Sequence, residues 1–406
     1  MKRFCLFIVA TLIAVLLISP AFCVGAAEIG QNYFLTFSAS QELYRNGEKL
    51  SDTERNHLLS RLTTLIKDYE NKVSASVEGS DVFALNQAEN GAEVQVSTQT
   101  ASLLARSEEL RSLTGGAFDY RLGGLVDLWG FWPGDVYSTP RPSPSHTEIT
   151  TRLAEMHASS LTIGGQTVQK TGNAIYEFGA VAKGHLSDLL QQELLAEGIT
   201  DGNFSLMSNH LLLGKKIEGE NSRKWRVGIK DPRKPTLECL TFEVSDAHVA
   251  TSGDYERYYV YDGKRYSHIL DAETGEPAQK GVMSVTVVGD SGALCDAVAT
   301  ASFSLGAKGA LALAESVGVK IVVICVDYKY YVSDGLTVKP SSEVYAGYPT
   351  CNYVKGDNAN APEIAQPVKA ETQQTSKKSH LTEWIVGGVA IAAALVLVVV
   401  LAVKKQ

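Results

Sequence analysis

The chain has 406 residues, a formal net charge of −8 at pH 7 and 45% hydrophobic residues. The acidic balance and the lack of basic clusters argue against nucleic acid as a partner. Between its two terminal segments, the chain is long enough to bury an ample core, in one large domain or two close-packed lobes.

The N-terminus has the features of a secretory signal peptide. Two basic residues precede an apolar run, Phe4 to Ile18, and small residues follow at Gly25 to Ala27. This order predicts that residues 1–27 are cleaved and that the mature chain begins around Glu28. A lipoprotein signal would use Cys23, but the bulky residue before it fits a lipidation site poorly.

The next segments alternate between helix and strand patterns. Apolar residues recur at helical spacing through Asp52 to Tyr69, after a serine that can cap the first turn. Thr98 to Leu113 repeats this pattern before a Gly-Gly break, and Ala182 to Glu197 is closed by Gly198. Strand patterns are found at 205–213, 224–230, 240–244, 258–261, 282–288 and 319–326. The sum predicts an α+β body over residues 28–355, with mixed sheets and packed helices.

A strand and a helix meet near residue 290. Met283 to Val288 reads as a strand, and a Gly-Asp-Ser-Gly break follows it, so we predict a helix over 291–306. Asp296 and Thr300 then share one face of this helix, where one hard cation can reach a carboxylate and a hydroxyl. Oxygen-only ligation favours Mg²⁺ over zinc. For an isolated pair of this kind, the simpler interpretation is preferred: Asp296 only complements the helix dipole, and Thr300 only packs.

The C-terminus predicts a tether and a membrane anchor. Residues 356–383 are polar, with almost no large apolar side chain before Trp384, which is typical of a disordered linker. Trp384 to Val403 then forms an uncharged apolar run of about 30 Å if helical, enough to span a membrane. The lysines in residues 404–406 predict a cytoplasmic tail and place the body outside the membrane.

Four blocks of sequence stand out along the chain. They are Thr114-Gly-Gly-Ala-Phe-Asp-Tyr120 with Leu125-Val-Asp-Leu-Trp-Gly-Phe131, Tyr176-Glu-Phe-Gly-Ala-Val-Ala-Lys-Gly184, Thr251-Ser-Gly-Asp-Tyr255 with Tyr266-Ser-His-Ile-Leu-Asp-Ala-Glu-Thr-Gly275, and Asp296 to Thr300. In this order, the blocks resemble the ApbE-like family of FAD-dependent flavin transferases. The resemblance covers about residues 35 to 345 and implies the family's α+β, T-fold-related body.

The resemblance implies a reaction and a ligand set. FMN would pass from FAD to a Ser or Thr hydroxyl of another protein through a phosphoester bond, with release of AMP. Mg²⁺ would be held by Asp296, Thr300 and a backbone carbonyl, that of Ala180. The FAD contacts would come from Ala117, Phe118, Asp119, Glu177, Lys183 and the Ile269 backbone.

His268 is the candidate proton handler or phosphate contact, because histidine titrates near neutral pH and a hydroxyl nucleophile gains reactivity from a nearby base. Asp296 is the rival base. A purely structural His268 would instead order the turn from Asp271 to Gly275.

The chain departs from the family pattern at several positions. Phe34 to Phe37 stands where Met-Gly-Thr is usual, and Ser74-Ala-Ser76 stands where an aromatic residue is common. Met207-Ser208-Asn209 replaces a Gly-Gly-Asp turn, and Ala272 replaces a proline.

These departures keep two alternative functions open. With water as the nucleophile, the same Mg²⁺ site would cleave FAD to FMN and AMP as a pyrophosphatase. A non-catalytic, membrane-tethered flavin-binding module is the other.

For the transferase we expect an extracytoplasmic acceptor, a membrane-associated electron-transfer protein, and a cell-membrane location with a single span.

Overall fold

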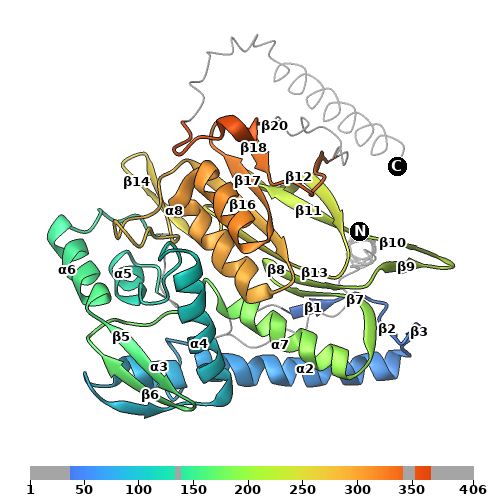
Figure 1. Ribbon diagram of the computed structural model, residues 1–406, viewed down its shortest axis with the longest axis horizontal. Coiled ribbons are helices and arrows are strands. Elements are labelled where there is room, and N and C mark those ends of the chain that lie inside the picture. Colours follow the sequence, from blue (N-terminus) through green and yellow to red (C-terminus); the bar gives the residue numbers. More distant parts are fainter. Residues whose placement is uncertain (1–36, 133–138, 342–352, 367–406) are drawn as a thin grey trace, which may run out of the picture. The chain divides into compact units, whose positions relative to one another are not determined.

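A ten-stranded sheet runs through the part of the chain that the structure, a computed structural model, describes: residues 37–132, 139–341 and 353–366 (Figure 1). The strand order is β20-β18-β17-β16-β13-β8-β7-β2-β3, with β1 also on β7. Neighbouring strands are antiparallel except the β18–β20 pair, which is parallel. The strands are β1 Phe37–Ala39, β2 Tyr44–Arg45, β3 Glu48–Lys49, β7 Ile199–Leu206, β8 Asn209–Leu213, β13 Ala247–Gly253, β16 Val282–Gly289, β17 Lys320–Cys325, β18 Lys329–Val332 and β20 Val354–Lys355.

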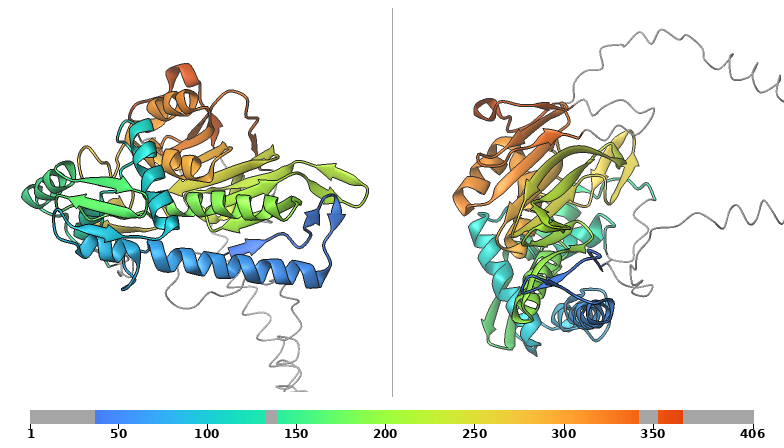
Figure 2. Two further views of the ribbon diagram at one scale, coloured as in Figure 1. Left: turned by 60° about the horizontal axis from the view of Figure 1, so that its bottom comes forward. Right: turned by 90° about the vertical axis from the view of Figure 1, so that its right-hand side faces the viewer.

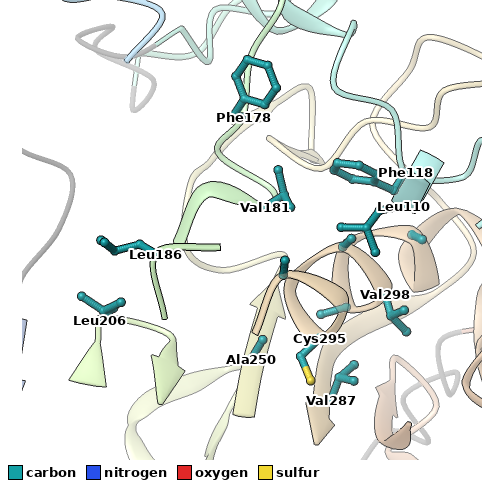
Figure 3. Packing of buried hydrophobic residues seen from close by; sticks show 14 of the residues in the cluster. Leu110, Phe118, Phe178, Val181, Leu186, Leu206, Ala250, Val287, Cys295 and Val298 are labelled. Carbon is teal, nitrogen blue, oxygen red and sulfur yellow. The ribbon is translucent and has the colours of Figure 1, made fainter. Parts of the chain in front are cut away.

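Helices cover one face of this sheet. α7 (Ala182–Ala196) and α8 (Gly292–Val317) pack on the central strands, while α2 (Asp52–Val73) lies along α7 and α4 (Thr98–Leu113) packs on α8 (Figure 1, Figure 2). Figure 3 shows Cys295 and Val298 of α8 next to Ala250 and Val287 of the sheet, in the main hydrophobic core. The first turns of α7 and α8 therefore lie against each other over the sheet.

A smaller sheet covers the opposite face. Its strands are β11 Trp225–Asp231, β12 Lys234–Val244 and β19 Lys339–Pro340. Side chains alternate along the central strands, so Val285 and Val287 pack under the helices while Val288 packs under the smaller sheet. Coverage of both faces explains why β16 is buried along nearly its whole length.

The remaining elements border the helices and the edges of the large sheet. β14 (Tyr258–Tyr261) and β15 (Lys264–Ser267) form a hairpin. Its tyrosine rings stack with Trp129 and Phe131 in a separate aromatic cluster. These elements are α3 Asp81–Gln87, β4 Glu93–Gln95, α5 Gly123–Leu128, α6 His146–His157, β5 Ser160–Gly164, β6 Thr167–Thr171, β9 Lys216–Glu218, β10 Asn221–Arg223, β14 Tyr258–Tyr261, β15 Lys264–Ser267 and the 3₁₀ turn Asn358–Asn360.

The predicted helices are confirmed, and one predicted strand is wrong. The helix expected at 291–306 is the first part of α8, which is interrupted at Gly306 by a backbone φ of 71°. The strand expected at 205–213 is instead the hairpin of β7 and β8, which turns at Met207 and Ser208. The segment contains no glycine or proline, the residues by which a hairpin turn is normally recognised.

Residues 356–366, which were predicted to belong to the tether, instead pack on the body. Gly356 donates its N–H to Tyr330, Ala365 donates to Lys280, and Lys308 pairs with Glu363. Ala361 and Ala365 are buried in the core, and such short apolar side chains left no visible pattern in the sequence. The rest of the predicted tether, the signal peptide and the Trp384–Val403 span lie outside the described residues.

Within the described residues, α8 is the helix long and apolar enough to cross a membrane. However, 61% of its most apolar window is buried inside the body. Its packing between the sheet and α4 is that of a core helix.

Candidate active site

A cavity of about 560 Å³ brings together every residue that the sequence nominated for the site. These residues come from the ends of several elements that are distant in sequence but adjacent in the fold. They are Ala117, Phe118, Asp119, Glu177, Ala180, Lys183, His268, Ile269, Asp296 and Thr300.

Two glycines allow the first turns of α7 and α8 to touch. A Cβ atom built on Gly184 would lie 2.1 Å from the carbonyl oxygen of Gly292, and one on Gly292 would lie 2.4 Å from that of Gly184. Any side chain at either position would force the two backbones apart. This contact lets Gly184 donate its N–H to Oδ2 of Asp296 at 3.0 Å. The Asp296 carboxylate is 2% exposed and is held at the start of α8.

Ala180 lies just before α7, whose N-cap is Val181. Gly184 is the third residue of this helix, so its N–H is one of the first-turn donors that have no carbonyl partner inside the helix, and it donates to Asp296 instead. The Ala180 carbonyl lies outside the hydrogen-bond ladder of α7. The carbonyl sits beside α7 in a segment that lines the cavity, as the metal-ligand prediction requires.

Lys183 and Thr300 complete the polar part of the cavity near Asp296. The Lys183 ammonium donates to the carbonyl of Gly179 at 2.9 Å and lies 3.7 Å from Oδ2 of Asp296. The Thr300 hydroxyl lies 3.4 Å from that of Ser252 on β13. A carboxylate, two hydroxyls and one ammonium group thus line a single wall.

His268 is held in one orientation at another side of the cavity. Its Nδ1 lies 3.1 Å from the carbonyl oxygen of Arg257, which can only accept, so Nδ1 carries the proton and Nε2 has a free lone pair. The edge of the ring contacts Phe131. Burial, with a further contribution from the positive charges of Arg257 and Lys183, holds the pKa of His268 well below its usual value. The ring is therefore neutral at pH 7.

The two carboxylates predicted to contact FAD already have protein partners. Asp119 forms a two-point ion pair with Arg121, at 2.9 Å to Nε and 2.6 Å to Nη2. Oε1 of Glu177 accepts the N–H of Gly179 at 2.7 Å. Each carboxylate therefore holds the cavity wall in shape and can accept ligand hydrogen bonds only through its remaining lone pairs.

The apolar candidates form part of the cavity wall. Phe118 is 2% exposed and belongs to the main core, so it borders the cavity from within the packed interior. Ala117, partly buried, lies beside it. The carbonyl of Ile269 accepts a hydrogen bond from Ala278 at 2.9 Å, which fixes the backbone after His268.

Sequence reasoning missed Asp188, which joins the two helices of the site. From α7, its carboxylate accepts from the N–H groups of Gly292 and Ala293 at 2.6 and 3.0 Å and from the Ser291 hydroxyl at 3.1 Å. It therefore caps α8 from outside that helix. No local pattern could reveal this, because the bonded residues are more than a hundred positions apart.

A buried Tyr-His-Ser chain was also missed. The hydroxyl of Tyr69, which lines the cavity, lies 2.9 Å from Nδ1 of His185, and Nε2 of His185 lies 3.0 Å from the Ser102 hydroxyl. Burial lowers the pKa of His185 to about 4 and raises that of Tyr69 well above its usual value. These hydrogen bonds between side chains hold α2, α4 and α7 together behind the cavity.

Comparison with known proteins identifies the family. The family model described as the ApbE family matches residues 35–323. An FAD:protein FMN transferase of Vibrio cholerae serotype O1 is 32% identical over 66% of this chain and 79% of that protein. One of Treponema pallidum is 34% identical over 68% of this chain and 80% of its own length.

Solved structures agree with the sequence comparisons. The flavin transferase ApbE from Vibrio cholerae superposes with a TM-score of 0.62 at 29% identity, covering 77% of this chain and 96% of that one. The Pseudomonas stutzeri flavinyl transferase ApbE gives 0.61 at 25% identity, covering 78% and 96%. The resemblance found in the four sequence blocks is thereby confirmed, and the chain belongs to the ApbE family.

Proposed function

We propose that this chain is an FAD:protein FMN transferase that uses Mg²⁺ to move FMN from FAD to a Ser or Thr hydroxyl of an extracytoplasmic protein, releasing AMP. The transferase activity is supported by the names of the relatives and by the ApbE structures. One observation carries the finer proposal: the residues nominated for metal, FAD and proton transfer all line one cavity.

The donor set of the cavity fits Mg²⁺. The buried Asp296 carboxylate, the Thr300 hydroxyl and the Ala180 carbonyl are all oxygen donors, which is the ligand chemistry of a hard cation. The hydrogen bond from Gly184 fixes Asp296, and the Ala180 carbonyl lies outside the hydrogen-bond ladder of α7. When bound, Mg²⁺ supplies positive charge at the phosphate oxygens.

The remaining chemistry falls to side chains of this protein. The acceptor hydroxyl oxygen bonds to the phosphorus on the FMN side of FAD, and the bond from that phosphorus to the bridging oxygen breaks. AMP leaves with the bridging oxygen, and the hydroxyl proton passes to Nε2 of His268. Lys183, next to Asp296, balances the charge of the phosphates.

His268 suits the role of base better than Asp296. Nδ1 of His268 donates to a backbone carbonyl, so Nε2 is available, and the lowered pKa keeps the ring neutral. Asp296 already accepts from Gly184 and is assigned to the metal. We therefore assign proton transfer to His268 and metal binding to Asp296.

The location of the enzyme is part of the proposal. The signal peptide predicted for residues 1–27 and the apolar run Trp384 to Val403 are the features that support an extracytoplasmic body with a single-span anchor. An acceptor at the outer face of the membrane, a membrane-associated electron-transfer protein, then lies within reach of the cavity.

The test is to incubate the full-length chain with FAD, Mg²⁺ and a candidate acceptor domain, and to record the acceptor's intact mass and the AMP released. A mass gain of one FMN with equal AMP supports the transferase. Free FMN and AMP without acceptor modification would support the pyrophosphatase instead. Uncleaved FAD with an acceptor that a related enzyme does modify would support a binding module. His268→Gln should lower the rate while leaving FAD binding intact.

A further inference from the structure

Met207 occupies an unusual backbone conformation at the edge of the cavity. It is the first residue of the two-residue turn between β7 and β8, and it lines the cavity with Ser208. Its φ is 57°, and the residue is 51% exposed. A large apolar side chain thus stands on a strained turn that lines the cavity.

The conformation is costly for this residue type. A positive φ brings the Cβ atom of a bulky side chain against its own backbone, whereas asparagine and aspartate tolerate it. Among the described non-glycine residues with positive φ, three are of the tolerant types, which leaves Met207 and Tyr328. Strain of this kind clusters at ligand-binding sites and persists where the surroundings fix the backbone.

The surroundings do fix this turn. Leu206 pairs with Asn209 across the hairpin, and Asn209 pairs with Ala250 on the next strand. Thr251 also donates its N–H to the carbonyl of Ser208 at 3.0 Å. With neighbours set on both sides, the turn presents Met207 to the cavity in a constant position.

We propose that Met207 is a ligand-binding residue whose thioether side chain packs on a flat aromatic ring of FAD. The inference rests on the proposed function, since it takes FAD as the occupant. Methionine sulfur makes favourable contacts with aromatic rings, and its flexible chain adapts to their shape. Binding would cover an apolar surface that water otherwise contacts. Either the isoalloxazine or the adenine offers the required ring.

The test compares stability and binding, which this proposal moves in different directions. FAD is titrated into the full-length chain in EDTA, followed by flavin fluorescence, and the melting temperature is measured separately. Met207→Gly removes both the strain and the ring contact, so we expect FAD binding roughly threefold to tenfold weaker with an equal or higher melting temperature. Met207→Leu keeps the apolar bulk and should bind within about twofold of wild type.

Tyr328→Gly is the matched control, because Tyr328 has a φ of 58° and is 48% exposed but does not line the cavity. It should bind FAD as the wild type does. Titrations with FMN and with ADP identify the ring, since Met207→Gly should weaken only the ligand that carries it.

Two results would overturn the inference alone: unchanged binding of FAD, FMN and ADP by Met207→Gly, or a melting temperature well below wild type, which would make Met207 a structural residue. Wild-type protein that binds no FAD would overturn the proposed function as well.

Discussion

Replacing Gly184 with alanine should damage both the fold and the site, because the added methyl group has no space. Its Cβ would lie 2.1 Å from the Gly292 carbonyl oxygen, 2.5 Å from the Gly292 carbonyl carbon and 2.8 Å from the Ala293 nitrogen. All three are backbone atoms, so relief requires α7 and α8 to separate by roughly 1 Å, toward ordinary van der Waals contact.

The energetic consequence can be worked out from the contacts. Overpacking of a core costs about 1–3 kcal/mol, and losing the Gly184 hydrogen bond to the Asp296 carboxylate costs about 1.5–3 kcal/mol more. The better helix propensity of alanine returns about 1 kcal/mol. The net expectation for Gly184→Ala is a destabilisation of roughly 1.5–5 kcal/mol, seen as a melting temperature lower by about 2–7 °C for a body of this size.

Thermal unfolding of the full-length chain is the assay, with Gly124→Ala as the matched control. A Cβ on Gly124, also in a helix, meets only side-chain atoms at 3.4 Å or beyond, which is ordinary contact. The control should be neutral or slightly stabilising. The view that the close helix contact builds the site would be refuted by a Gly184→Ala variant that has the melting temperature of the wild type and cleaves FAD at the normal rate.

Three further predictions follow from the site. Asp296→Asn should abolish Mg²⁺-dependent AMP release while far-UV circular dichroism stays native, and full turnover would remove Asp296 from the metal site. Asp188→Asn should lower the free energy of unfolding by about 1–2 kcal/mol, because the cap of α8 is weakened. The control Ser145→Ala, which removes an exposed cap from α6 away from the cavity, should lower it by less. The pKa of His185 is lowered to about 4, so below pH 6.5 the unfolded chain binds a proton that the folded chain does not. The free energy of unfolding should therefore fall by up to about 3 kcal/mol between pH 6.5 and 4. Urea unfolding measures it, and the difference in this free energy between the wild type and His185→Gln should become smaller as the pH falls.

Local patterns were enough to predict α2, α4, α7, the first part of α8 and the strand β16, but not the helices α3, α5 and α6. Thr98 to Leu113 matches α4 at both ends, because a serine cap and a Gly-Gly break mark its boundaries. The strand expected at 282–288 is β16, whose run of β-branched residues fits a sheet covered on both faces. In each case the residues that decide the structure lie within the segment itself.

The hairpin at Met207 and the packing of residues 356–366 depend on contacts with residues far away in the sequence, which no local sequence pattern includes. Met207 turns the chain without the usual glycine because pairing with β13 holds the turn from the side. Ala365 is buried, and its N–H donates to the carbonyl of Lys280, which is far away in the sequence. A propensity argument assigns the first segment to one strand and the second to a linker, since it has no access to these partners.

The candidate site shows the same division more sharply. Its residues were nominated from blocks that recur in a family, but the geometry that unites them comes from residues with no chemistry of their own. Gly184 and Gly292 let two helix ends touch, and Asp188 fixes that contact by capping α8 from α7. Only then does the Gly184 N–H, which has no carbonyl partner inside α7, reach Asp296. The proposed oxygen site for Mg²⁺ thus depends on the way two helices cross, and a sequence can specify its donors without revealing the crossing that brings them together.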